Sequence, residues 1–349
     1  MMMAAMHEAL WWEPGENGRV VCTLCPRNCK IPEGQPGFCF IRANVGGKLR
    51  SLAYGRPVAV HVDPIEKKPL FHFLPGSMIF SMGTAGCNLG CMFCQNWSMS
   101  KSRSDLDRSG ELDPRSVVAG AIQHGCPSIA FTYNEPTIWG EYVIDVAREA
   151  RAAGLRTVMV TNGYIEKGPL HDIYEHIDAA NVDLKAHTEG FYSRVTLSHL
   201  GPVLEALVEM RRVMGVWVEV TNLMIPGLND DPGETARLAT WILENLGPDV
   251  PLHFTCFHPD FKMTDRPATP RATVARARAI ARQAGLRFVY EGNVLSEGND
   301  TFCPSCGCRL IHRSWHNVVE NRVLDGRCPD CHEAIPVVTE GGRRDAAAP

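Results

Sequence analysis

The chain has 349 residues, of which 45% are hydrophobic and 21% are charged, a composition typical of a globular protein with one large core and small additional modules. Its formal net charge is −4, and the sequence has neither a basic stripe nor an RNA-recognition signature, which argues against nucleic-acid binding. No apolar stretch reaches the length of about 18 residues that spans a membrane, and the N-terminal MMMAAMHEALWW lacks the features of a signal peptide. We therefore expect a cytoplasmic protein without a membrane partner.

Most of the 14 cysteines fall into three groups. In a large chain without an export signal, closely spaced cysteines indicate metal ligands rather than disulfides. The groups divide the chain into a Cys-rich N-terminal module over 1–75, a partial barrel over 76–295, and a zinc-ribbon-like C-terminal module with a tail over 296–349.

The first group lies in CTLCPRNCKIPEGQPGFC, which carries Cys22, Cys25, Cys29 and Cys39. Four sulfurs separated by turn-forming Pro and Gly predict a small module that is held together by a bound metal. Zinc and a second iron–sulfur cluster both accept four thiolates, so the pattern does not decide between them. Reduced cysteines without metal are the third interpretation. Further along this segment, Lys67 and Lys68 are interpreted as a solvated basic pair.

Between residues 76 and 295, short apolar runs alternate with helical patterns, as in βα units with a parallel sheet. The runs predict strands over 78–84, 128–134, 156–163, 179–185, 216–225 and 252–257, with 287–293 as a candidate seventh strand. Helices are predicted over 114–125, 141–154 and 270–285, each ending at a Gly that suits a helix C-cap. The fold class is therefore α/β, a partial (β/α)6-type parallel barrel with two small modules.

The loop after the first barrel strand holds Cys87, Cys91 and Cys94 in the sequence GTAGCNLGCMFCQNW. A cubane iron–sulfur cluster normally takes four thiolates, so three leave one iron open to another ligand, as in catalytic zinc sites. The loop has no His, and Asn and Gln are poor ligands for either metal. The alternative interpretation is a structural zinc site with a distant fourth ligand.

Polar residues recur where the predicted barrel strands end, and in parallel barrels functional groups gather at this edge. Glu135 follows the second strand, Asn162 ends the third, Asp183 and Lys185 end the fourth, and His258 follows the sixth. Each is weak evidence alone, but their joint placement predicts a site at this edge.

The C-terminal segment pairs Cys303 and Cys306 with Cys328 and Cys331 across 21 intervening residues. Two such knuckles are typical of a zinc ribbon. We favour zinc over iron because each Cys-Pro-x-Cys turn suits a closed tetrahedral site. The remaining Cys308 is interpreted as a bystander thiol.

The sequence resembles the radical S-adenosylmethionine (SAM) proteins of the AmmeMemoRadiSam system, which are related to pyruvate formate-lyase activating enzymes. The resemblance rests on CTLCPRNCKIPEGQPGFC, DPIEKKPLFHFLPG, GCNLGCMFCQNW, FTYNEPT, VTNGY, VDLKA and CPSCG…CPDC. It implies that Cys87, Cys91 and Cys94 hold a [4Fe–4S] cluster whose open iron binds SAM, and that a flavodoxin or ferredoxin type protein supplies the electron. The implied reaction is reductive cleavage of SAM to a 5′-deoxyadenosyl radical that abstracts hydrogen from an unidentified substrate.

The resemblance also implies roles at the strand ends. Glu135 stands where activating enzymes carry a Gly-Gly-Glu-type motif that contacts the SAM amino group; this chain has Tyr133-Asn134-Glu135 there, so only Glu135 and neighbouring carbonyls are carried over. Asn162 is placed near the SAM ribose or carboxylate, and Asp183, Lys185 and His258 among polar groups of the active site. Because activating enzymes act on a partner protein, a protein substrate is one option, and a small molecule is the other. A zinc-binding interaction protein without catalysis is the alternative function.

Overall fold

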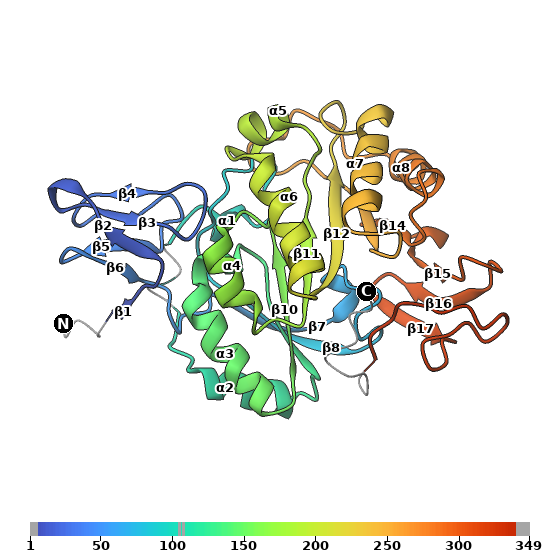
Figure 1. Cartoon of the computed structure of the whole chain (residues 1–349), viewed down its shortest axis with the longest axis horizontal. Helices are drawn as coiled ribbons and strands as arrows, with labels where there is room; N and C mark the ends of the chain where they lie inside the picture. The colour runs from blue at the N-terminus through green and yellow to red at the C-terminus, as the bar shows by residue number, and fades with distance from the viewer. Residues whose placement is uncertain (1–5, 104–105, 107–108, 340–349) are drawn as a thin grey trace.

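A computed structural model describes residues 6–103, 106 and 109–339, and its centre is one eight-stranded sheet with the order β14-β13-β12-β11-β10-β9-β8-β7 (Figure 1). The strands are β7 (Ala59–Pro64), β8 (Met78–Gly83), β9 (Ser128–Phe131), β10 (Arg156–Thr161), β11 (Ala179–Asp183), β12 (Trp217–Met224), β13 (Leu252–Cys256) and β14 (Val289–Gly292). All pairs from β8 to β14 are parallel. In the described chain β7 and β14 are the two edges, so the sheet is an open, partial barrel, and the predicted fold class and strands are confirmed.

The eighth strand, β7, is the one that sequence reasoning missed. It pairs antiparallel with β8, from Ala59 opposite Gly83 to Pro64 opposite Met78. The alternation of apolar and polar residues in β7 would place the valines in the core and the polar residues in solvent. The structure shows the reverse at two positions, because Val60 is 39% exposed while Asp63 is buried. The sheet therefore begins before residue 76, where the predicted barrel starts.

Helices cover the outer face of the sheet (Figure 1). They are α2 (Pro114–Gln123), α3 (Gly140–Ala152), α4 (Lys167–Tyr174), α6 (Leu200–Val208), α7 (Pro232–Asn245) and α8 (Arg271–Gln283), with short α1 (Trp97–Ser100) and α5 (Glu189–Phe191). Short 3-10 segments lie at η1 (Glu16–Gly18), η2 (Ile65–Lys67), η4 (Pro136–Trp139) and η7 (Glu297–Asn299), and π-helical turns at η5 (Tyr192–Thr196) and η6 (Glu209–Val213).

The helix ends follow local sequence signals. At the start of α2, the Asp113 carboxylate accepts hydrogen bonds from the backbone N–H groups of Arg115 and Ser116, at 3.0 and 3.1 Å, and Pro114 occupies the first helical position. After the three predicted helices α2, α3 and α8, the chain turns through glycines with positive φ: 65° at Gly125, 80° at Gly154 and 112° at Gly285. The predicted glycine C-caps are thus confirmed.

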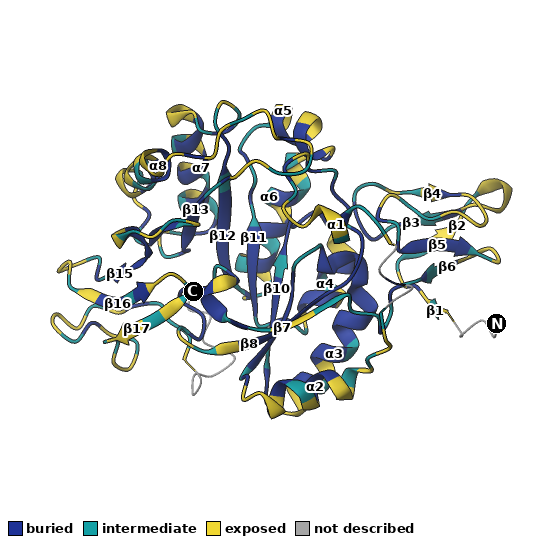
Figure 2. Cartoon of the chain, turned by 180° about the vertical axis from the view of Figure 1, so that it is seen from behind, coloured by how far each residue is buried: buried dark blue, intermediate teal, exposed yellow. Residues whose placement is uncertain are grey.

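Small sheets flank the barrel at opposite ends (Figure 1). On one side, β1 (His7–Glu8), β6 (Lys48–Ser51) and β5 (Arg42–Val45) form one sheet, and β2 (Trp12–Pro14), β3 (Val20–Cys22) and β4 (Lys30–Ile31) form another. On the other side, β15 (Thr301–Phe302), β16 (Arg309–Ser314) and β17 (Asn317–Asn321) form a third. Exposed residues concentrate on these flanking modules and on the outer helices, while the central strands are buried (Figure 2). No helix of the described residues is long and apolar enough to cross a membrane.

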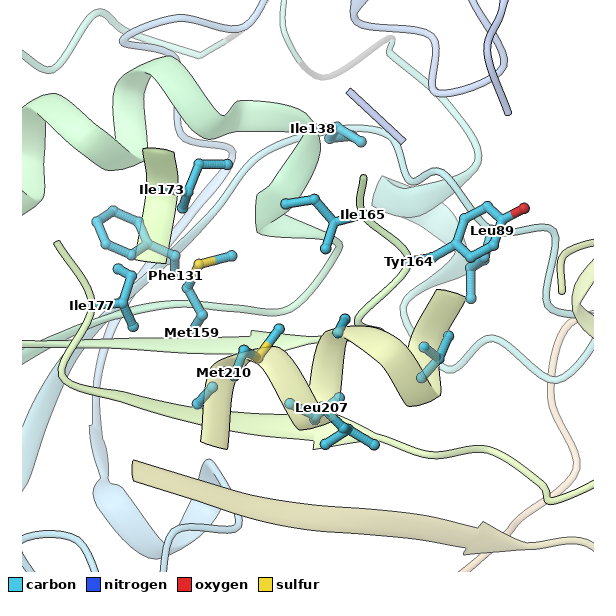
Figure 3. Packing of buried hydrophobic residues seen from close by; sticks show 14 of the residues in the cluster. Leu89, Phe131, Ile138, Met159, Tyr164, Ile165, Ile173, Ile177, Leu207 and Met210 are labelled. Atoms are coloured by element: carbon cyan, nitrogen blue, oxygen red, sulfur yellow. The ribbon is translucent and has the colours of Figure 1, made fainter. Parts of the chain in front are cut away.

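The core between the sheet and its helices reaches the cysteine loop. Phe131 of β9 and Met159 of β10 are fully buried against Ile173 of α4 (Figure 3). At the far end of this cluster, Leu89 of the cysteine loop packs beside Tyr164, which follows β10 (Figure 3). Burial of a side chain such as Leu contributes about 2 kcal/mol, so Leu89 anchors the loop to the barrel.

A buried ion pair joins the N-terminal module to the barrel. Arg42 of β5 and Glu141 of α3 are 1% and 2% exposed, and Arg42 Nη1 lies 2.8 Å from Glu141 Oε1. The backbone of Leu10 completes the network, donating to Glu141 at 2.7 Å and accepting from Arg42 Nη2. Because both charges are shielded from water, removing either partner would leave the other charge buried without compensation.

Glu141→Gln should lower the free energy of unfolding by about 3 kcal/mol, because it leaves the buried Arg42 charge uncompensated. The matched control is Glu8→Gln, which removes a surface partner of Lys48 and should change stability by no more than about 0.5 kcal/mol. Denaturant unfolding of the two variants beside the wild type measures the difference. Equal stability of the two variants would contradict the role given to the Arg42–Glu141 pair.

Candidate functional site

A cavity of about 250 Å³ opens at the C-terminal ends of the parallel strands. The loops that line it follow β8, β9, β10 and β11, so parallel topology alone brings together side chains that are far apart in the sequence. Of the residues predicted for this edge, the cavity is lined by Cys87, Cys91, Cys94, Glu135, Asn162, Asp183 and Lys185.

His258 is the predicted residue that the structure does not bring to the cavity. It is exposed beyond the end of β13, with its ring nitrogen 3.5 Å from the carbonyl oxygen of neighbouring Pro259. Phe257 before it is buried, whereas His258 and Pro259 are both exposed to solvent.

The cysteine loop is held by backbone hydrogen bonds to the π-helical turn η5. Gly90 N–H donates to Thr196 O at 2.7 Å, and Met92 N–H donates to Val195 O at 3.0 Å. Leu89 N–H points at the Cys87 sulfur, 3.4 Å away. Burial raises the pKa of the Cys87 and Cys91 thiols. Both thiols therefore keep their protons unless a metal centre binds the sulfurs and displaces the protons. Thiols held in this way are suitable ligands for an iron–sulfur cluster.

The carboxylate of Glu135 connects the loop after β9 to the end of β10. One oxygen accepts hydrogen bonds from Thr137 N–H and Thr161 Oγ1, at 2.9 and 2.8 Å, and the other accepts from Asn162 N–H at 2.8 Å. The side chain is 1% exposed, and this burial raises the pKa of Glu135 although the hydrogen bonds oppose the shift. Glu135 is therefore fully engaged in fixing two loops.

Asn162 extends this connection to the cysteine loop. Its Nδ2 donates to Asn88 Oδ1 at 2.9 Å and lies 3.9 Å from the Cys87 sulfur, while its Oδ1 accepts from Tyr164 N–H. Asn88 in turn donates to Tyr164 O at 2.7 Å. Hydrogen bonds to cluster sulfurs tune iron–sulfur centres, and Asn162 is positioned to make one.

Asp183 and Lys185 form a charged pair on the other wall of the cavity. Lys185 Nζ lies 2.9 Å from Asp183 Oδ2 and 5.7 Å from the centre of the Phe93 ring. Burial acts to lower the pKa of Lys185, but the charge and the hydrogen bond of Asp183 outweigh it and hold the pKa above its ordinary value. Lys185 is therefore a cation beside the cysteine loop.

Sequence reasoning missed a second buried network next to the cavity. Lys68, expected to be solvated, is 2% exposed and lies 2.7 Å from Asp63 Oδ2, which also accepts from Tyr133 OH at 2.5 Å. Burial lowers the pKa of Lys68 to about 8, against the opposing charge of Asp63. Lys67 is half-exposed, so it alone fits the expected solvated cation. The missed signal was Asp63, five residues before Lys68 on the unrecognised strand β7.

The C-terminal cysteines form a metal-binding group. The sulfurs of Cys303, Cys306, Cys328 and Cys331 all lie within 4.8 Å of one another, and two pairs are 3.5 and 3.7 Å apart. With zinc–sulfur bonds of about 2.3 Å, tetrahedral thiolates are roughly 3.8 Å apart, so this spacing suits one ion. Cys308 is outside the group, as expected for a bystander, and accepts from Arg322 at 3.2 Å.

The N-terminal cysteines share one buried region beside the barrel. Cys22, Cys25 and Cys39 are 7%, 7% and 8% exposed, and Cys29 is half-buried. Burial raises the pKa of Cys25 to about 12. The backbone brings the two ends of the first three cysteines together, because Cys22 N–H donates to Cys29 O at 3.0 Å.

The fold and the cysteine loop define a class of protein. Residues 82–239 match the family model of the radical SAM superfamily, so this part of the chain is a radical SAM domain. Such a domain implies SAM and a [4Fe–4S] cluster as cofactors, and radical SAM enzymes generally need a reductant.

Several known proteins are similar to this chain. The uncharacterized protein MJ0808 of Methanocaldococcus jannaschii is 43% identical over 336 residues, covering 95% of this chain and 100% of the relative. The pyruvate formate-lyase-activating enzyme of Clostridium pasteurianum is 24% identical over 164 residues, covering 46% of this chain and 67% of the relative. A radical SAM methyltransferase from Sphaerobacter thermophilus has a similar fold, with a TM-score of 0.50, 17% identity, and coverage of 68% of this chain and 71% of that one. Membership of the AmmeMemoRadiSam system stays a prediction.

Replacing Cys303 and Cys306 together by Ser should remove one metal ion per chain and unfold the C-terminal module, because such modules derive much of their folding free energy from the metal. Metal analysis of the purified variant tests this, and we expect the ion to be zinc. Cys308→Ser is the matched control and should keep the metal. An unchanged metal content in the double variant would contradict the site.

Proposed function

We propose that this chain is a radical SAM enzyme related in mechanism to the glycyl-radical activating enzymes, with Cys87, Cys91 and Cys94 as the cluster ligands. When bound, the cluster and SAM supply reductive cleavage of the C5′–S bond and a 5′-deoxyadenosyl radical that takes a hydrogen atom from substrate. The observation that carries the proposal is the meeting of the three thiols with Glu135, Asn162 and Lys185 in one cavity at the sheet edge. A zinc-binding protein without catalysis is not favoured, because the superfamily match covers this loop.

In this proposal the polar residues of the cavity position the cysteine loop and SAM. Glu135 holds the loop after β9 against β10, and in this proposal the neighbouring backbone carbonyls accept hydrogen bonds from the SAM amino group. Asn162 connects the SAM region to the cysteine loop, because its Nδ2 lies 2.9 Å from Asn88 Oδ1 and 3.9 Å from the Cys87 sulfur. Lys185 and Asp183 stand on the opposite wall, where a cation can balance the negative charge of a thiolate cluster. Phe93, which is 4% exposed, excludes water beside them.

A protein substrate and a protein reductant complete the proposal. The similarity to an activating enzyme, a class that acts on a partner protein, supports a macromolecular substrate, although the fold alone does not fix the substrate. The electron donor is of the flavodoxin or ferredoxin type.

Anaerobically reconstituted protein should be brown, with broad absorbance near about 400 nm, and should cleave SAM when reduced. Cys87→Ala, Cys91→Ala and Cys94→Ala should each abolish cleavage, because the loss of one of three ligands leaves the cluster poorly held. Cys256→Ala, at the end of β13, is the control and should retain activity. A colourless protein that contains only zinc would contradict the enzyme.

The substrate class is tested separately by incubating the reduced enzyme with SAM and with fractionated cell extract. We expect a protein fraction to stimulate 5′-deoxyadenosine formation, because activating enzymes act on protein loops. Chromatography of the nucleoside product measures the effect. Stimulation by a protein-free fraction alone would exclude a macromolecular substrate while leaving the radical chemistry intact.

A further inference from the structure

We propose that Cys22, Cys25, Cys29 and Cys39 hold an iron–sulfur cluster, in direct neighbourhood of the Cys87 loop, and not a zinc ion. The proposal concerns the N-terminal module alone and stands whether or not the Cys87 loop acts as described above.

The first argument is sulfur spacing, compared among the three cysteine groups of this chain. In the C-terminal group all four sulfurs lie within 4.8 Å of one another, as a single ion requires. Among the described residues, no three of the N-terminal cysteines have this spacing, and neither do Cys87, Cys91 and Cys94. In a cluster each thiolate binds a different iron, so the sulfurs stand farther apart than around one ion. The N-terminal group therefore resembles the cluster loop and differs from the zinc-type site.

The second argument is that the backbone gathers the N-terminal cysteines. Cys22 N–H donates to Cys29 O at 3.0 Å, and Asn28 N–H donates to Cys25 O at 3.1 Å, so Cys22, Cys25 and Cys29 lie on one tight turn. Cys22, Cys25 and Cys39 are buried in the same core. Four thiolates brought together in this way can each bind one iron of a cluster.

The third argument is an unpaired donor beside the group. Arg42 is 1% exposed and follows the buried Cys39 by three residues. Its two terminal nitrogens are used by Glu141 and Leu10, but its buried Nε has no hydrogen-bond partner in the structure. Leaving a buried donor unsatisfied costs about 1–3 kcal/mol. An iron–sulfur cluster brings inorganic sulfides that accept hydrogen bonds, whereas a zinc ion brings no acceptor.

The N-terminal group also touches the cysteine loop of the barrel. A side chain at Gly86, which has a φ of 85°, would collide with the backbone oxygen of Cys39, so glycine is required there for the two segments to meet. The Arg27 guanidinium donates to the backbone oxygens of Asn88 and Leu197. The two cysteine groups are thus joined by backbone contacts one residue away from Cys87, and the two clusters are neighbours.

The test is the iron and zinc content of the anaerobically reconstituted full chain. The wild type should bind about eight irons per chain, in two clusters, and one zinc. A variant with Cys87, Cys91 and Cys94 all replaced by Ala should keep about four irons and its absorbance near 400 nm. Adding Cys22→Ser and Cys25→Ser to that variant should remove the remaining iron without changing the C-terminal zinc.

A colourless triple variant with two zinc ions per chain would overturn the proposal, and so would a triple variant without metal at the N-terminal cysteines. If the triple variant does not fold, the wild type decides, because four irons with two zinc ions would equally contradict a second cluster. Failure of the Cys87 site has a different signature: the wild type and the triple variant would then contain the same amount of iron.

Discussion

The buried carboxylate of Glu135 is the contact on which the geometry of the cavity depends. Parallel strands deliver their loops to one edge, but they do not fix how those loops face each other. Glu135 does so by accepting two hydrogen bonds, from Thr161 and Asn162 at the end of the next strand, while a third, from Thr137 N–H, fixes its own turn. Asn162 then reaches Asn88 and Cys87 in the loop after β8. Three consecutive loops are thereby locked around the place where SAM is proposed to bind.

The flanking modules are attached by the same physical means, buried polar groups that pair across the junction. On the N-terminal side the Arg42–Glu141 pair bridges β5 and α3. On the C-terminal side, Glu219 of β12 accepts from the backbone of Phe71 and His72 and from His253 at 2.7 Å. His72 is in turn 2.7 Å from Pro336 O, in the C-terminal module. Partner loss at such sites is costly, so both modules are fixed relative to the barrel.

Much of the barrel could be predicted from sequence because its parallel strands are buried on both faces and read as short apolar runs. The cysteine groups were evident from spacing alone. The strand β7 was missed because its inward residue is Asp63, whose burial makes sense only with Lys68 and Tyr133 beside it, and those partners are not adjacent in sequence. The same network explains why Lys68 did not fit the expectation of a solvated lysine.

His258 is a residue that the sequence predicted for the site but that the structure leaves outside the cavity. Its position after a strand was a sound reason to expect a site residue, but the direction in which the chain leaves β13 decides whether a side chain faces the cavity or solvent, and no local pattern encodes that direction. The separation between a cluster and a single ion was likewise hidden, because the N-terminal and C-terminal cysteines offer the same ligand type. Among the described residues, the C-terminal sulfurs lie within 4.8 Å of one another, a spacing that the sequence does not encode.

The central claim is that three thiols leave one iron of the Cys87-loop cluster open for SAM. Electron paramagnetic resonance of the reduced protein, recorded with and without SAM in a variant lacking Cys22 and Cys25, tests it most directly. The account predicts that SAM changes the spectrum of the reduced cluster, because SAM binds the open iron. An identical spectrum with and without SAM, from a protein that contains the cluster, would contradict it.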